Sequence, residues 1–427
     1  MFKSKTNMKL FPIYKMFSWD LLFYYAISFL FLTQEKGFSA SQVISADAFY
    51  IFFKMFVQIF CIMLLDKLGN KTCLITGNIL VALSIYIVII SANFSHIIIA
   101  FFVMAFGYSF KDLCESPLLY SSIPQCSDKG KIFAKIDSKG ASLWYFFDGI
   151  TSIIASFSFV INAYFPMYFC IACLIISALI CFNFEDDNVT EPNSQESNDE
   201  EYSVKGLKEY IQDTKYAFKF IFKSRRLRAL LLFSIMFYSI LNISSTLRSS
   251  LFVDLNVPAQ YFGIFAAIYQ IIASISSKKQ DWFHNKFRNK TLAFFSMSMC
   301  LLFISAGIIG TINNSSSIVI ILIIFSIHYI VKGPYYTLID KYLNSFSSKD
   351  IRNKIFSARS LVISIFSTII LQIASLIIDH FTTAQSLIIL GISFLIGFMF
   401  TLQYMKTRVG LKPEEYKKSD IEFITLK

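Results

Sequence analysis

The stretch Asp66-Lys67-Leu68-Gly69-Asn70-Lys71-Thr72 is a short polar turn between two long apolar runs, Val43–Leu65 and Cys73–Ile90. Each run is close to the roughly 20 residues that an α-helix needs to cross a lipid bilayer. The turn therefore predicts a hairpin of two membrane-spanning helices.

The same kind of turn recurs late in the chain. Lys286-Phe287-Arg288-Asn289-Lys290-Thr291 begins 219 residues after Lys67. Two further stretches recur in nearly the same register. Ser39-Ala40-Ser41-Gln42 returns 218 residues later as Val257-Pro258-Ala259-Gln260, and Ser116-Pro117-Leu118-Leu119 returns 217 residues later as Gly333-Pro334-Tyr335-Tyr336. Three recurrences in register favour two homologous halves in the same order.

The composition is that of a membrane protein. Of the 427 residues, 55% are hydrophobic and 16% are charged, whereas soluble chains carry roughly 25% charged residues. We predict an all-α polytopic membrane protein with about twelve transmembrane helices in two parallel six-helix halves. The apolar runs are Phe11–Leu32, Val43–Leu65, Cys73–Ile90, Ile97–Ile123, Ala141–Val160, Met167–Phe184, Leu227–Phe252, Phe262–Ser276, Leu292–Ile312, Ile318–Leu338, Leu361–Ile378 and Ser386–Tyr404.

The net charge of +11 follows the topology of a membrane protein. Lys and Arg gather in every second connecting turn, and in the other set only Lys36 is basic. Because basic residues remain on the cytoplasmic side, both termini are predicted to be cytoplasmic, in a plasma or inner membrane. The basic residues are thus expected to lie at the surface of the lipid bilayer, and no binding of nucleic acid is expected.

Four segments are predicted. Residues 1–184 and 227–404 form the two six-helix bundles, and residues 405–427 form a basic cytoplasmic tail. The linker 185–226 begins with an acidic stretch expected to be disordered. It continues from Val204 to Ile221 as a basic amphipathic helix expected to lie on the inner leaflet. A role for this helix in binding a partner is left open.

The first turn resembles the signature loop between the second and third spans of the major facilitator superfamily. Asp66, Lys67, Gly69 and Lys71 match its acidic, basic and glycine positions, whereas Ile62 stands where the family usually has a glycine. The second-half copy has Asn285 where the aspartate would be. The resemblance implies two rocking halves whose motion is coupled through Asp66, Gly69 and Lys71, without contact between this loop and the substrate.

The resemblance implies a secondary active transporter that works by alternating access. Proton-coupled export of an amphipathic small molecule by a monomer is the first expectation, although the fifth span, Ala141–Ile150, lacks the Gly-Pro-rich stretch of many proton-driven exporters. The alternatives are uptake of a small organic solute and a non-transporting receptor or scaffold. No P-loop, metal-ligand cluster or nucleophile–base arrangement is evident, so we expect no enzyme activity, no cofactor and no metal site.

Ionisable residues inside the spans are the candidate site residues. A charge at a helix centre costs roughly 2.5–3.5 kcal/mol on insertion scales, so such residues normally face a cavity or a partner. An Asp20–Lys54 ion pair is expected, which leaves Asp112 and Asp148 as proton carriers. Arg248 lies toward the outer side. The predicted substrate and proton pathway consists of Asp20, Lys54, Lys111, Asp112, Asp148 and His328.

Aromatic residues lie at the depth of Asp20 and Asp148. They are Trp19, Tyr24, Tyr25, Trp144 and Tyr145. Aromatic walls with a few polar groups suit an amphipathic ligand. Plain core packing is the alternative.

The repeat also predicts a gate. Pro117 matches Pro334, so Glu115 matches Lys332. In the resembled fold the cytoplasmic ends of the fourth and tenth spans approach each other when the inner side closes. Glu115 and Lys332 are therefore predicted to form a gate pair of opposite charge. The alternative is that each is solvated at the end of its helix or pairs within its own half.

Overall fold

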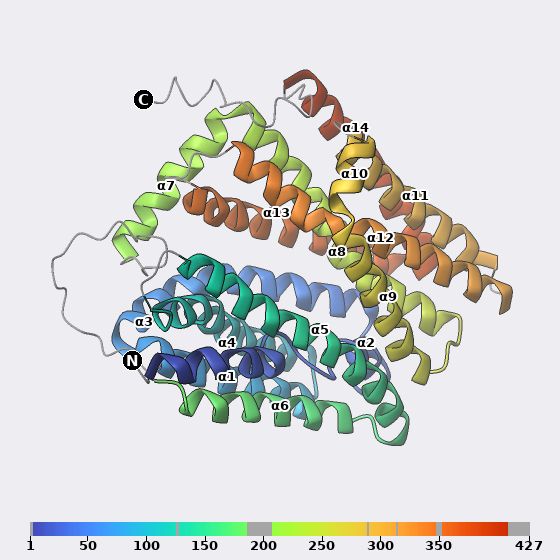
Figure 1. Ribbon diagram of the computed structural model, residues 1–427. Coiled ribbons are helices and arrows are strands. Elements are labelled where there is room, and N and C mark those ends of the chain that lie inside the picture. Colours follow the sequence, from blue (N-terminus) through green and yellow to red (C-terminus); the bar gives the residue numbers. More distant parts are fainter. Residues whose placement is uncertain are drawn as a thin grey trace. The chain divides into compact units, whose positions relative to one another are not determined.

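The computed structural model describes residues 3–124, 128–185, 207–287, 290–312, 315–346 and 352–408. All regular elements among these residues are helices (Figure 1). The acidic stretch expected after residue 185 and most of the expected tail lie outside the described residues. In chain order the helices are α1 Lys3–Ser18, α2 Ser28–Leu30, η1 Phe31–Glu35, α3 Ala40–Ile90, α4 Phe94–Ser121, α5 Lys129–Ile161, α6 Phe165–Phe182, α7 Leu207–Lys223, α8 Arg225–Asp254, α9 Gln260–Lys278, α10 Gln280–Phe287, α11 Thr291–Ile312, α12 Ser315–Phe346, α13 Arg352–His380 and α14 Thr383–Arg408.

Ten helical segments of the described chain are long and apolar enough to cross a membrane. They confirm a multi-pass membrane protein. Two predicted spans are missing from this set: the first, Phe11–Leu32, and the eighth, which corresponds to α9. The ten segments are Ala40–Leu65, Leu68–Ile90, Phe94–Ser121, Lys129–Ile161, Phe165–Phe182, Leu227–Asp254, Thr291–Ile312, Ser317–Tyr336, Ala358–His380 and Thr383–Met405.

The first span is not a continuous helix. α1 ends at Ser18, the chain then turns irregularly as far as Ile27, and helical structure resumes in α2 and η1. Phe23 has a positive φ of 65°, which is rare for a bulky residue. At the start of the break, the Asp20 carboxylate accepts a hydrogen bond from its neighbouring backbone N–H, of Leu21, at 2.9 Å. A short polar side chain that bonds nearby backbone in this way competes with helix formation.

The predicted hairpin turn is present at Gly69. α3 contains both the second and third spans, and Gly69 interrupts its helical backbone with φ 76° and ψ 164°. This conformation is essentially restricted to glycine. The Lys71 ammonium group donates a hydrogen bond of 2.8 Å to the backbone carbonyl of Phe182. The turn is therefore attached to the end of α6.

The chain forms two compact units. The first contains residues 1–37, 49–210 and 259–267, and the second contains residues 38–48, 211–258 and 268–427. In the first unit α1 packs against α5 and α6. In the second unit α11 packs against α14 and α12, and α8 packs against α13 and α14. The compact units follow the two halves of the repeat, except that two short segments are grouped with the opposite half.

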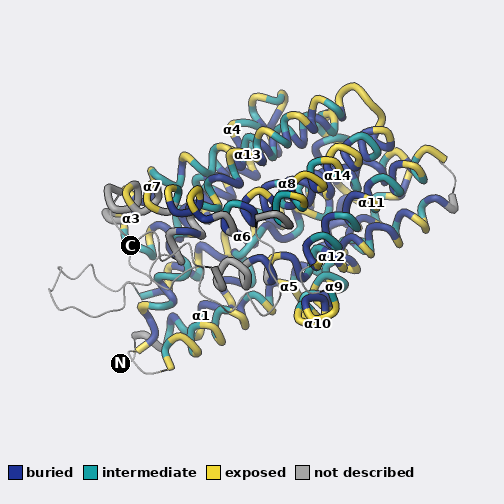
Figure 2. Tube along the Cα trace, turned by 90° about the horizontal axis from the view of Figure 1, so that it is seen from above, coloured by how far each residue is buried: buried dark blue, intermediate teal, exposed yellow. Residues whose placement is uncertain are grey.

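Most helices bury one face and expose the other (Figure 2). The exposed faces of the spanning helices carry large apolar side chains, such as Phe146, Ile161 and Phe400, which are 71%, 78% and 73% exposed. Such faces suit lipid contact. In the linker the structure has the helix α7, in which Phe220 and Ile221 are buried, whereas Lys215 and Lys219 are exposed.

Candidate functional site

The break in the first span places Asp20 among hydrogen-bond donors. Its Oδ1 atom accepts hydrogen bonds from the hydroxyls of Tyr25, at 2.9 Å, and Tyr108, at 2.8 Å, in addition to the bond from Leu21. Tyr108 belongs to α4, so the bond connects the broken span to the fourth span. We call Asp20, Tyr25 and Tyr108 the Asp20 site.

Lys111 donates a hydrogen bond to the backbone at the same break. Its side chain is almost entirely buried, and its ammonium group donates to the carbonyl of Ser18, the last residue of α1. The ammonium also lies 4.6 Å from the centre of the Tyr108 ring. A helix end inside a bilayer leaves carbonyls that water cannot satisfy. The position of Lys111 therefore supports a structural role, in contrast to the substrate pathway predicted for it.

The ion pair of Lys54 differs from the expected one. Its ammonium lies 2.7 Å from Asp112 Oδ2, and Asp20 is held by the three hydrogen bonds described above. The Lys54 ammonium also lies 5.7 Å from the centre of the Tyr108 ring, a member of the Asp20 site. Asp112 is thus an ion-paired carboxylate in this structure, and its role as a proton carrier stays a prediction. Sequence spacing could not reveal this, because Lys54 and Asp112 lie on different helices.

Three of the predicted aromatic residues contact one another. Trp19 lies 5.1 Å from Trp144 and 5.3 Å from Tyr145 between ring centres, and Trp144 lies 5.2 Å from Tyr145. All three contacts are edge-to-face, the geometry that aromatic pairs favour. The indole N–H of Trp144 also donates to the backbone carbonyl of Asp20, at 3.4 Å. We call Trp19, Trp144 and Tyr145 the aromatic triad.

The remaining two predicted aromatic residues differ in exposure. Tyr24 and Tyr25 contact each other at 5.5 Å between ring centres. Tyr24 is buried, whereas Tyr25 is about half exposed and bonds Asp20 through its hydroxyl.

Asp148 lies on α5, one helical turn after Trp144 of the aromatic triad. The residue is 7% exposed. Within the described part of the chain it forms no ion pair; the pairs there join Lys15 to Asp137, Lys54 to Asp112 and Lys131 to Asp128. Asp148 is therefore a buried carboxylate without a neutralising cation in the described structure.

Glu115 is bonded within its own unit. Its Oε1 atom accepts a hydrogen bond of 2.8 Å from the hydroxyl of Tyr14, which is fully buried on α1. Lys332 belongs to the second unit, where its ammonium lies 5.0 Å from the centre of the Tyr329 ring. The gate pair therefore stays a prediction.

His328 is a packing residue in this structure. Its ring is 2% exposed, its Nε2 atom lies 3.1 Å from the Ser244 hydroxyl, and it stacks on Phe303. Close to it, Arg248 donates to the hydroxyl of Tyr329. Sequence spacing could not show that Arg248 and Tyr329 meet, because they lie on different helices, α8 and α12.

Sequence reasoning missed several partners of the site residues. Tyr14 and Tyr108 were not singled out, although Tyr108 lies three positions before Lys111 and so shares its helix face. Lys15 was not singled out either, yet it is buried and pairs with Asp137 at 2.5 Å. Its distance from the other amino-terminal lysines, inside the first apolar run, was the available signal.

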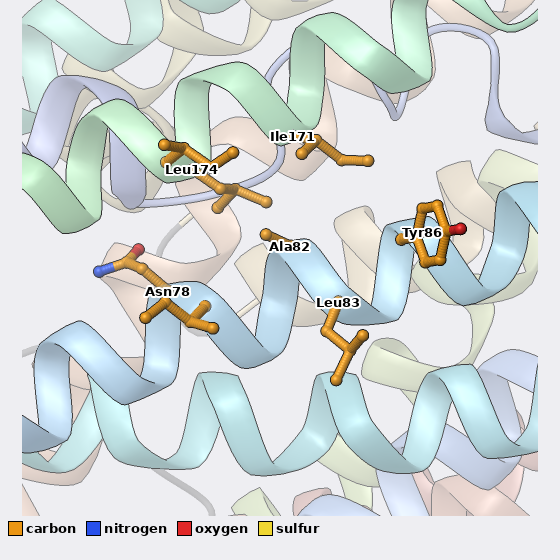
Figure 3. A pocket seen from close by; sticks show the side chains of 8 residues that line it. Asn78, Ala82, Leu83, Tyr86, Ile171 and Leu174 are labelled. Carbon is orange, nitrogen blue, oxygen red and sulfur yellow. The ribbon is translucent and has the colours of Figure 1, made fainter.

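A separate pocket of about 280 Å³ lies between α3 and α6 (Figure 3). Its lining is almost entirely apolar, with side chains such as Ala82, Leu83 and Leu174, and Asn78 at one end. None of the predicted site residues lines it. The pocket is thus distinct from the cluster of charged and aromatic side chains around Asp20.

The helical architecture, the signature turn and the buried charges together define a membrane transporter of the two-half type. The family model of the Major Facilitator Superfamily matches residues 15–343, and the chain belongs to this family. Membership of this family points to a transporter and not to an enzyme. No curated protein matches the chain.

Solved structures of transporters share the fold. The chain is similar to the nucleoside transporter NupG, with 13% identity, a TM-score of 0.70 and coverage of 95% of this chain and 100% of that one. It is also similar to the peptide transporter POT in complex with sulfate, with 12% identity, a TM-score of 0.65 and coverage of 96% and 95%. A POT family transporter in complex with 5-aminolevulinic acid has 13% identity, a TM-score of 0.63 and coverage of 93% and 94%.

Proposed function

We propose that this transporter exports an amphipathic small molecule in exchange for protons, with the Asp20 site, the aromatic triad and Asp148 forming the part of the pathway in the first unit. The observation that carries the proposal is Asp148, a carboxylate buried inside a span without a neutralising cation among the described residues. Such a group in a bilayer marks a proton relay or a ligand contact.

The neighbours of Asp148 support a site for an amphipathic ligand. The aromatic triad provides apolar surface one turn away, and Tyr145 is about half exposed. The carboxylate of Asp20 and the hydroxyl of Tyr25 provide polar groups near the aromatic triad. Pockets of this composition bind ligands that have both apolar and polar parts.

The broken first span adds a further argument. Irregular backbone at membrane depth is tolerated where it is buried in protein or lines a cavity, and interrupted helices mark the binding sites of several transporter folds. The break at Trp19–Ile27 contains Asp20 and provides one member of the aromatic triad. Substrate binding near this break is thus the function that the geometry supports best.

The test is transport in proteoliposomes that contain the purified protein and a pH-sensitive dye in the lumen. A panel of amphipathic compounds is screened for compounds whose movement drives proton flux in the opposite direction. Asp148→Asn should reduce gradient-driven transport at least tenfold and leave exchange of labelled for unlabelled substrate intact. The reason is that an amide preserves the shape of the side chain and cannot release a proton.

Asp128→Asn is the matched control, because Asp128 precedes the same helix and pairs with Lys131 at the surface. It should behave as the wild type does. A normal response of Asp148→Asn to the pH gradient would exclude Asp148 from proton coupling, and compound movement without proton flux in the wild type would exclude the coupling itself.

A further inference from the structure

A group of cationic and phenolic side chains lies inside the second unit. Arg248 on α8 contacts two tyrosines: its guanidinium carbon is 5.3 Å from the ring centre of Tyr269 and 5.6 Å from that of Tyr329. The two rings stack at 4.8 Å, nearly parallel. Lys332 approaches Tyr329 within 5.0 Å. We call Arg248, Tyr269, Tyr329 and Lys332 the cation–tyrosine cluster.

The cluster has two positive charges, and no carboxylate among the described residues forms an ion pair with either of them. Between residues 227 and 405 the sequence has acidic residues only at positions 254, 281, 340, 350 and 379, and the 38–48 segment of this unit adds Asp47. Of the acidic residues between 227 and 405, Asp254 is the last and Asp379 the next-to-last residue of its span, and the other three lie outside the spans. Within the described residues, neither Arg248 nor Lys332 forms an ion pair. Cationic side chains inside spans normally face a partner or a water-filled cavity. The cluster therefore lacks the negative charge that such a site requires.

The hydroxyl of Tyr269 is the second observation. Tyr269 is 2% exposed, and among the described residues its hydroxyl has no hydrogen-bond partner. A buried polar group without a partner costs roughly 1–3 kcal/mol. The Tyr329 hydroxyl, in contrast, accepts a hydrogen bond from Arg248. The phenol of Tyr269 is therefore a donor available beside a cation.

His328 does not satisfy these groups. Its ring contacts Tyr329 at 5.6 Å, but its Nε2 atom is engaged with the Ser244 hydroxyl. It also cannot supply negative charge. A bound anion would neutralise the two cations of the cluster and would accept a hydrogen bond from the hydroxyl of Tyr269.

We infer that the cation–tyrosine cluster binds an anionic group, a carboxylate or a phosphate, of the transported molecule. The guanidinium of Arg248 supplies a planar pair of donors that matches such groups. Tyr269 donates an additional hydrogen bond, and Lys332 adds positive potential. The identification of the anion as part of a transported molecule rests on the proposed function, whereas the anion site itself rests on the cluster alone.

The test is equilibrium binding to the purified full-length protein in lipid nanodiscs, because binding does not require transport. Two pairs of fluorescent probes are compared: dansylglycine with its uncharged amide, and naphthyl phosphate with naphthol. At least one anionic member should bind the wild type ten times more tightly than its uncharged partner, a difference of about 1.4 kcal/mol. If neither anion is preferred, the inference is overturned.

Variants assign the preference to the cluster. Arg248→Gln should abolish it, and Tyr269→Phe, which removes only the hydroxyl, should reduce it several-fold. Arg228→Gln is the matched control, because Arg228 lies on the same helix but bonds the Tyr404 hydroxyl, outside the cluster. If Arg248→Gln does not fold, Tyr269→Phe and Arg248→Lys decide the question. An unchanged preference in these variants would place the anion elsewhere.

Two more measurements separate the possible outcomes. If short-chain phosphatidylglycerol displaces the probe, the site belongs to a lipid headgroup and the assignment to a transported molecule is overturned. If proteoliposomes transport only uncharged or cationic compounds, and Arg248→Gln has no effect on them, this inference fails although the proposed function stands. If anions bind as expected but nothing is transported, the proposed function fails and the anion site stands.

Discussion

Tyr108 shows how one side chain can decide the roles of its charged neighbours. Its hydroxyl bonds Asp20, and its ring lies next to the ammonium groups of Lys54 and Lys111. With Tyr108 in this position, Asp20 is stabilised by phenolic donors and does not need Lys54 as a counterion. Lys54 can then pair with Asp112. Carboxylates that are bonded or paired in this way differ from Asp148, which has neither kind of partner in the described structure.

Gly69 gives a prediction at the same scale. Its φ of 76° and ψ of 164° are costly for any residue with a Cβ atom, by about 1–3 kcal/mol. Gly69→Ala should therefore lower the thermal stability of the purified protein and slow transport, while substrate affinity remains close to that of the wild type, because the turn lies away from the Asp20 site. Thermal unfolding and transport assays measure the two effects.

Gly130→Ala provides the control for that substitution, because Gly130 has open space around it and ordinary backbone angles. A fall in affinity of Gly69→Ala with unchanged turnover would argue against a role of the turn in coupling the two halves.

The identities of the site residues could be predicted from the sequence, but their partners could not. An ionisable residue within an apolar run is recognisable from composition, so Asp20, Lys54 and Asp148 were identified without a structure. Partner choice depends on the rotation of each helix about its axis and on which helices are adjacent. Those quantities come from packing among helices that are distant in sequence, as the pairing of Lys54 with Asp112 illustrates.

At the scale of elements, the broken first span is the main departure from the prediction. The run Phe11–Leu32 is apolar apart from a few polar positions, so its composition indicates one continuous helix. The break is held instead by groups from other helices: Lys111 and Tyr108 from α4, and Trp144 from α5. Local sequence contains no record of such bonds, whereas the two spans joined at Gly69 are bounded by a local polar turn and were predicted well.

Lys111 tests this interpretation. Lys111→Met retains most of the volume of the side chain but leaves the carbonyl of Ser18 without its donor. The free energy of unfolding should fall by about 1–3 kcal/mol, the usual cost of a buried unsatisfied polar group. The expected result is a lower denaturation midpoint in nanodiscs, together with greater reactivity of a cysteine introduced at position 23 in the break.

Lys131→Met is the control for Lys111→Met, because it removes an exposed lysine that has only a surface ion pair. It should change neither the denaturation midpoint nor the reactivity of the cysteine at position 23. If Lys111→Met is as stable as the wild type and yet fails to transport, Lys111 would act on the substrate and would not serve the backbone.

At the scale of the whole molecule, the sequence repeat and the alternation of basic turns predict one topology. A reporter fused after Ser194 or after Lys406 should be cytoplasmic, and one fused after Asn314 should be exterior, because basic turns remain on the cytoplasmic side. Protease protection or a pair of compartment-specific reporters makes the measurement. A cytoplasmic signal after Asn314 would contradict both the number of spans and the repeat.

The class of the molecule was therefore accessible from the sequence, since span number, charge alternation and the signature turn are all local or statistical features. The family match over residues 15–343 confirms it. Substrate identity is different in kind. It depends on a small number of side chains that folding brings together from different helices, and we propose that the cation–tyrosine cluster is one such group.

The hydrogen bonds at the first break also bear on how the protein is synthesised. The donor for the Ser18 carbonyl lies 93 residues further along the chain, and Tyr108, the donor to Asp20 from another helix, lies 88 residues further along. When the first segment leaves the ribosome, those donors have not yet been synthesised. Moving the Ser18 carbonyl and the Asp20 carboxylate into the hydrocarbon of the bilayer is therefore unfavourable at that stage. We expect the nascent segment to remain at the membrane surface or within the translocation machinery until the fourth span emerges. Membrane integration of the amino terminus is then a delayed event, completed together with the fourth span.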